Sequence, residues 1–170
     1  MAESININMD LNRKQFKLDF FGRELVIETS RLAEQASSAV LARYGDTAVL
    51  ATVVLGKEDK DTDYFPLVVD YEERFYAAGK IYGSRFVRRE GRPSDEAILS
   101  GRVVDRTISP LFDQRLRRDV QIVLTIIEID EENDTDFVSF IAASTALAIS
   151  PVPWAGPVAV ISMLKDANGQ

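Results

Sequence analysis

Two alternating apolar runs that meet at a tight-turn pair constrain the fold of this chain most. The segment SSAVLARYGDTAVLATVVLG, residues 37–56, places Gly45–Asp46 between these runs. Alternation is typical of half-buried strands, and a Gly-Asp pair favours a hairpin turn. A similar pattern comes earlier, where runs at Gln15–Phe20 and Glu24–Thr29 flank Phe21–Gly22. The sequence therefore predicts two consecutive β-hairpins.

Further strands are predicted after these hairpins. YFPLVVDYEE, residues 64–73, indicates a strand with Pro66 near its start, and DVQIVLTIIEID, residues 119–130, is a strongly β-like run. GKEDKDTD, residues 56–63, is expected to be a charged surface loop. The acidic stretch DEENDTD, residues 130–136, is expected to connect a strand to a helix, with Asp134 or Thr135 as the cap.

The first helix is predicted to begin after Ser94, which has the side chain of an N-cap. Asp95 and Glu96 follow, where carboxylates interact favourably with the helix dipole. The helix would run to about Ser109, where Pro110 stops it.

One side of this first helix is expected to be apolar, and the other to carry Arg102 and Arg106, which are four residues apart. The expected apolar face consists of Ile98, Leu99, Val103, Val104 and Ile108. A second helix, FVSFIAASTALAIS at residues 137–150, is rich in Ala and Ser, which allows close approach to a sheet.

The last part of the chain is predicted to form a Pro-rich turn, PVPWAGP, followed by a strand, VAVISML, at residues 158–164. Asn168–Gly169 then indicates a hairpin turn, yet no return strand follows. We therefore expect residues 1–170 to be a domain that is incomplete at its C-terminal end, cut from a larger protein. The expected fold class is α+β, with mixed sheets and about two substantial helices.

Composition excludes several kinds of chemistry. The 170 residues include no cysteine and no histidine, so disulfides, thiolate metal sites, imidazole ligands and a histidine base are absent. No apolar run approaches the roughly 20 residues that span a bilayer, and no apolar signal core opens the chain. We therefore expect a cytoplasmic protein that does not bind membranes.

Charge is distributed very unevenly along the chain. The net charge is −7, yet residues 80–118 hold ten basic and five acidic residues. RFVRREGRPSDEAILSGRVVDR, residues 85–106, contains six of the arginines. A basic patch in an acidic body favours a local anionic ligand over a generally basic surface, although a solvated arginine-rich loop fits the charge pattern equally well.

The arginine segment has the residue types that single-stranded RNA binding requires. Guanidinium groups make forked hydrogen bonds to phosphate, and an aromatic ring can stack on a base. Phe86 would supply that ring, although packing under the loop is an equal alternative. The candidate RNA-binding residues are Arg85, Phe86, Arg88, Arg89, Arg92, Arg102 and Arg106. Asp105 could instead pair with Arg102 or Arg106.

Other functional sites have little support. An EF-hand loop counted from Asp130 would need Gly at its sixth position and Glu at its twelfth, where Thr135 and Ile141 stand. Gly79, Gly83 and Gly91 match neither a P-loop nor a dinucleotide fingerprint. No metal ligand and no catalytic residue is therefore assigned.

From about Phe20 to Met163 the chain resembles the N-terminal part of bacterial polynucleotide phosphorylases. The pieces that carry the resemblance are YAAGKI, FVRREGRPSDEAIL, RVVDRTISPLF, and AASTALAIS followed by WAGP. The resemblance implies the first RNase PH-like core domain, a fold of the ribosomal protein S5 domain 2-like type. It implies a phosphorolytic 3′-to-5′ exoribonuclease that uses inorganic phosphate as co-substrate and releases nucleoside diphosphates during RNA degradation.

The family resemblance also implies a homotrimer that encloses a channel, assistance by Mg²⁺, and a second core domain with KH and S1 domains that this sequence lacks. The family's catalytic and metal-binding residues lie mainly in that second core domain, so this segment is expected to be non-catalytic. The family's channel loop, which grips single-stranded RNA with two aromatic residues and two arginines, matches Phe86, Val87, Arg88 and Arg89.

The match to the family is not complete. Val87 replaces the second aromatic residue, Arg85 is an apparent insertion, Thr107 replaces a proline, and Ser109 replaces an arginine. A non-enzymatic assembly or scaffold module, whose arginines pair with acidic partner surfaces, remains the alternative. A small autonomous enzyme that uses carboxylates has the least support, because no residue is placed to act as its base.

Overall fold

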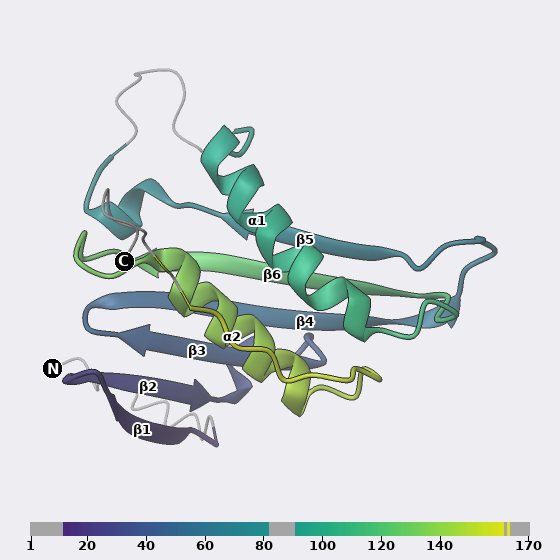
Figure 1. The fold of residues 1–170 in the computed structure, drawn as a ribbon, viewed down its shortest axis with the longest axis horizontal. Helices are drawn as coiled ribbons and strands as arrows, with labels where there is room; N and C mark the ends of the chain where they lie inside the picture. Colours follow the sequence, from purple (N-terminus) through teal and green to yellow (C-terminus); the bar gives the residue numbers. More distant parts are fainter. Residues whose placement is uncertain (1–11, 82–90, 162, 164–170) are drawn as a thin grey trace, which may run out of the picture.

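The computed structural model describes residues 12–81, 91–161 and 163, which form one mixed β-sheet with two α-helices on one face (Figure 1). The six strands lie in the order β1-β2-β3-β4-β6-β5. They are β1 (Lys14–Phe20), β2 (Arg23–Thr29), β3 (Ser38–Tyr44), β4 (Thr47–Asp59), β5 (Leu67–Glu72) and β6 (Arg118–Glu128). The α+β expectation is confirmed, with a single mixed sheet.

Both predicted hairpins are present. The β1–β2 and β3–β4 pairs are antiparallel, and Gly22 and Gly45 turn them with positive φ angles of 77° and 59°. The charged surface loop predicted over residues 56–63 was wrong in part, because β4 continues to Asp59, where it pairs with Arg118. The charged residues of this segment lie on the solvent-exposed end of a long strand. Because charged side chains are tolerated there, they do not end the backbone pairing of β4 with β6.

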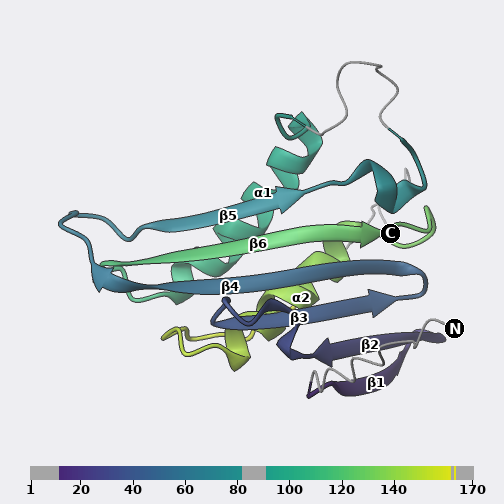
Figure 2. The same ribbon diagram turned by 180° about the vertical axis from the view of Figure 1, so that it is seen from behind.

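The helices are α1 (Asp95–Ile108) and α2 (Thr135–Ile149). Three short 3₁₀ turns are η1 (Arg31–Ala33) between β2 and β3, η2 (Phe75–Ala78) after β5, and η3 (Ser109–Leu111) directly after α1. Helix α2 packs on β3 and β4, and α1 packs on β5. Seen from behind, the opposite face of the sheet carries no helix among the described residues (Figure 2). No described helix is long and apolar enough to cross a membrane.

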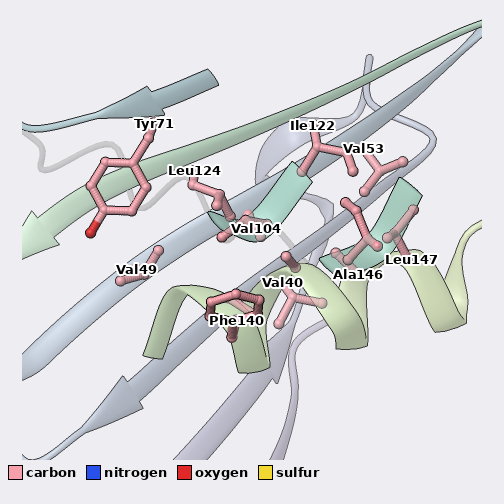
Figure 3. Close-up of a cluster of buried hydrophobic side chains, with 14 of the residues drawn as sticks. Val40, Val49, Val53, Tyr71, Val104, Ile122, Leu124, Phe140, Ala146 and Leu147 are labelled. Atoms are coloured by element: carbon pink, nitrogen blue, oxygen red, sulfur yellow. The ribbon is translucent and has the colours of Figure 1, made fainter. Parts of the chain in front are cut away.

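The core lies between the sheet and the two helices. Figure 3 shows Val40, Val53 and Ile122 of the sheet meeting Phe140 and Leu147 of α2. The buried alanines of α2 allow the helix to approach the strands closely, as its composition indicated. These alanines are Ala142, Ala143 and Ala146.

Helix α1 buries a different set of residues from the one predicted. Its bounds and its Ser94 cap are confirmed, and Val104 and Ile108 are buried. Leu99 and Val103, however, are 62% and 53% exposed. The helix contacts the sheet through its small residues Ala97 and Gly101, which bring its backbone close to β5 and turn Leu99 and Val103 outward.

The acidic connector between β6 and α2 is ordered by Asp130. Its carboxylate accepts hydrogen bonds from the backbone N–H of Asp46 at 3.1 Å and from Thr47 Oγ1 at 3.0 Å. It also accepts from the backbone N–H of Glu132 and of Asn133, at 2.9 and 2.8 Å. Asp130 thus ties the connector to the β3–β4 turn, and Asp134 caps α2 as predicted.

The strand predicted over residues 158–164 is absent from its described part, residues 158–161 and 163. Val158 and Val160 pack against the core, and Ser144 Oγ of α2 bonds both the N–H and the C=O of Val158. The alternating pattern correctly indicated an extended segment, but a strand needs a partner, and none pairs with it among the described residues.

Candidate nucleic-acid interface

The candidate interface lies on the outer side of α1. Ser94 fixes where this helix begins, because its Oγ accepts from the N–H of Ala97 at 3.0 Å and donates to Glu73 Oε2 at 2.8 Å. Glu73 directly follows β5, so the start of the helix is fastened to the end of the strand. The arginines on α1 therefore have a defined position relative to the sheet.

Gly101 sets how closely α1 approaches β5. A Cβ atom at this position would lie 3.3 Å from Tyr71 Cβ and 3.7 Å from Val69 O. Such a contact is tighter than most real side chains make, so glycine permits the observed approach. The strand on which α1 packs, β5, is an edge strand of the sheet.

Asp136 joins three elements beneath the interface. Its Oδ1 accepts from the Tyr71 hydroxyl of β5 and its Oδ2 accepts from Ser100 Oγ of α1, each at 3.0 Å. Burial raises the pKa of the Tyr71 phenol, and the negative charge of Asp136 raises it further. The phenol therefore keeps its proton and remains the donor in this contact.

Three of the predicted RNA-binding residues lie in the described part of the chain. Arg102 and Arg106 are exposed on α1, and Arg92 is exposed just before the Ser94 cap. Among the described residues, no carboxylate lies within ion-pair distance of any of the three, Asp105 included. Their positive charge is therefore not neutralised by a described neighbour, as a binding site for an anion requires.

A shallow cleft of about 320 Å³ runs between β5 and α1 beside this surface. Arg102 and Asp105 of α1 line one side, and the strand Leu67–Tyr71 lines the other. Its charged groups have opposite signs, so the cleft itself is not a simple anion pocket. Of the uncompensated arginines, Arg102 lines the cleft, and Arg106 lies one turn further along the same helix.

The other predicted residues, Arg85, Phe86, Arg88 and Arg89, lie outside the described residues. The sequence reasoning did not identify Gly101, Ser100 or Asp136 as the residues that position α1. Asp136 was placed in the acidic connector, and its two partners come from segments 36 and 65 residues away. The only local signal was a Gly in mid-helix, which costs stability unless close packing requires it.

Metal ligation has no support in the described residues, where no group of three or more acidic side chains could hold a metal ion.

Residues 22–153 match the family model described as the 3′ exoribonuclease family, domain 1. The chain is 48% identical over 155 residues to a polyribonucleotide nucleotidyltransferase of Halalkalibacterium halodurans, and 50% identical over 151 residues to that of Bacillus cytotoxicus. These matches cover 91% and 89% of the chain, but only 22% and 21% of the relatives. The chain thus spans about a fifth of the length of these curated relatives.

Solved structures with the same fold include rice Rrp46, at a TM-score of 0.56 and 12% identity, which matches 84% of this chain and 57% of that one. An Archaeoglobus fulgidus exosome with RNA bound to the active site has a TM-score of 0.56 and 25% identity, over 80% of this chain and 58% of that one. The rice protein supports the fold alone. The RNase PH-like fold expected from the sequence is confirmed.

Proposed function

The chain belongs to the 3′ exoribonuclease family, of which it carries the first RNase PH-like domain, and from this membership we propose that it guides RNA in a phosphorolytic 3′-to-5′ exoribonuclease. In that reaction, an oxygen of inorganic phosphate attacks the terminal phosphodiester of RNA. The bond to the 3′ oxygen breaks, a nucleoside diphosphate leaves, and the shortened RNA keeps its 3′ hydroxyl. In this proposal the domain holds RNA and does not itself perform the attack.

The observation that carries the proposal is the exposure of Arg102 and Arg106 on one side of α1, without a described carboxylate partner, in a chain whose net charge is −7. Forked guanidinium contacts to phosphate suit a single strand, because they grip the backbone regardless of sequence. The solved relative with RNA bound to its active site supports RNA as the ligand.

Arg85, Phe86, Arg88, Arg89 and Arg92 are proposed to extend this surface, because they directly precede α1 in the chain. Magnesium assistance, phosphate as the co-substrate, a homotrimer and a cytoplasmic location belong to the same proposal and rest on the family resemblance. In a trimer, three copies of the surface would surround one strand, so each subunit alone would bind weakly.

Binding of the 170-residue chain to a fluorescent single-stranded RNA across a salt series tests the proposal. Each phosphate contact contributes ~0.7 to the slope of log K against log salt for a single strand. Replacing Arg102 and Arg106 together by Gln should lower that slope by about 1.4 and weaken binding at every salt concentration. Arg31→Gln is the control, since it removes an exposed arginine from η1, between β2 and β3. Equal effects of the two changes would contradict the proposal.

A second candidate is the assembly or scaffold module, because Leu99 and Val103 are exposed on α1 beside the two arginines. Apolar residues mixed with arginine are typical of protein interfaces. Replacing Leu99 and Val103 by Ser separates the two functions. Retained RNA binding with loss of self-association in sedimentation would assign these apolar residues to a protein contact, whereas a matching loss of RNA binding would assign them to RNA.

A further inference from the structure

Phe21 is an exposed aromatic residue in a strained position at the tip of the β1–β2 hairpin. Its side chain is 88% exposed, and its φ angle of 53° lies in the left-handed region. Glycine and asparagine adopt this conformation easily, whereas a bulky side chain does so only with backbone strain. An exposed aromatic side chain on a strained backbone contributes little to the stability of the fold. Its presence is better explained by a role in binding.

The ring stands on an ordered base. Its ring makes an edge-to-face contact with the ring of Phe20, with centroids 4.6 Å apart, and Phe20 stacks on Phe137 of α2 at 5.6 Å. The Tyr44 hydroxyl donates to the Phe20 carbonyl at 3.0 Å, and Asp19 Oδ1 accepts from the N–H of Gly22 at 3.0 Å. These contacts to β3 and α2 hold the hairpin tip in place. The Phe21 ring itself is exposed to solvent and accessible to a ligand.

The charged side chains of the hairpin and of the nearby acidic connector leave an excess of negative charge. Two cations of the hairpin are already paired, Arg23 with Glu132 at 3.1 Å and Lys17 with Glu24 at 3.1 Å, and the third, Lys14, lies opposite Thr29 at the end away from the turn. Arg23 also donates to Asn133 Oδ1 at 2.6 Å, which fastens the hairpin to the acidic connector. Glu131 and Asp46, exposed on the connector and on the next turn, have no ion-pair partner among the described residues.

Phe21 and the connector lie at the same end of the sheet, since Arg23, two residues after Phe21, contacts Glu132 and Asn133. An aromatic face and uncompensated carboxylates at one end of the sheet suit a cation with a flat apolar surface. A guanidinium group has both properties, since it stacks on aromatic rings and is more weakly hydrated than an ammonium group. RNA fits this site poorly, because Glu131 and Asp46 would repel its phosphates. The site also lies on the far side of the sheet from the arginine surface, since β1 and β5 are its opposite edges (Figure 1).

We propose that the tip of the β1–β2 hairpin is a docking point for a protein partner, in which an arginine of the partner stacks on Phe21 and is held by the neighbouring carboxylates. This inference is independent of RNA binding by α1. It accounts for both the strained aromatic residue and the acidic connector beside it.

Titration of the chain with a tetra-arginine peptide, followed in aromatic ¹H–¹³C NMR spectra, tests this proposal. The Phe21 ring signals are identified by their absence from Phe21→Asn, a variant that keeps the net charge and suits the left-handed turn. In the unchanged chain these signals should shift, and a tetra-citrulline peptide of the same shape but no charge should leave them in place. Static Phe21 signals at saturating tetra-arginine would overturn the proposal.

Affinity for the same peptide separates an aromatic contact from a general attraction to an acidic protein. Phe21→Asn and Phe21→Leu should each bind about 2–5-fold more weakly, the fold-change that corresponds to an exposed cation–π contact, and Phe21→Tyr should retain the affinity. Glu131→Gln should also weaken binding. If Phe21→Leu binds as tightly as the unchanged chain, or if Phe21→Asn weakens RNA binding instead, the proposal is wrong.

Discussion

Ser100 on α1 donates its hydroxyl to Oδ2 of Asp136, across 3.0 Å, while the other oxygen of this carboxylate accepts from Tyr71 on β5. One side chain at the start of α2 thereby sets the position of α1 relative to the sheet. Since α1 carries Arg102 and Arg106, the orientation of the proposed RNA surface depends on this buried contact.

Asp136→Ala should destabilise the chain by about 1–3 kcal/mol, because it leaves two partly buried hydroxyls without their acceptor. Urea unfolding measures this loss. A double-mutant cycle with Ser100→Ala should give a coupling energy of about 0.5–3 kcal/mol, as contacting residues do. Purely additive losses would show that the Ser100 contact contributes nothing to stability.

Gly101→Val should destabilise the fold by about 1–3 kcal/mol, because a branched side chain cannot fit between α1 and the backbone of β5. The nearest contact for an added Cβ is Tyr71 Cβ, at 3.3 Å. Arg106→Val is the matched control, since it places the same side chain on the exposed face of the same helix. Thermal unfolding of both variants makes the comparison, and an equal loss would indicate a propensity effect instead of a steric one.

The sequence predicted the elements whose signals are local. The turn residues Gly22 and Gly45, the Ser94 and Asp134 caps and the alternation of β3 and β4 each act over a few residues, so hairpins and helices were placed correctly. The apolar face of α1 was assigned incorrectly in part. Which side of a helix is buried depends on what it packs against, and β5 accepts Gly101 where the hydrophobic pattern favoured Leu99 and Val103.

In the candidate RNA-binding surface, too, only the features with local sequence signals could be predicted. A cluster of arginines on α1 is visible in the sequence, because charge and helical spacing are local properties. The Asp136 contact is not visible, since its partners come from two other elements brought together only by the fold. The extended segment around Val158 was mistaken for a strand because periodicity reports side-chain alternation and not hydrogen-bonded pairing.

Acidification should destabilise the fold through Glu28, which is only 4% exposed in a cleft between β1, β2 and β3. Burial raises the pKa of this carboxyl, but hydrogen bonds from Arg13 and Gln15 and the charges of Arg13 and Arg43 outweigh it, so the pKa lies below its usual 4.5. A lowered pKa means that Glu28 stabilises the fold fully above about pH 4.5, and that this stabilisation is lost as the pH falls through the folded-state pKa.

Urea unfolding at a series of pH values checks this dependence. Glu28→Gln should be less stable than the unchanged chain at neutral pH and should lose less stability between about pH 5 and pH 2. Glu34→Gln, a change at an exposed glutamate beside η1, is the control and should leave the acid limb unaltered. Parallel acid limbs for Glu28→Gln and the unchanged chain would refute the role of Glu28.

Gly45→Ala should destabilise the β3–β4 turn more than Gly22→Ala destabilises the β1–β2 turn. Both glycines have positive φ angles, so each alanine introduces similar backbone strain of order 1 kcal/mol. A Cβ at Gly45 would also lie 2.5 Å from Nδ2 of Asn133, an amide that donates to Asp130, whereas a Cβ at Gly22 meets nothing within 4 Å. The difference between the two losses in urea therefore isolates the contact between this turn and the acidic connector. If the two variants lose equal stability, the connector does not hold the turn.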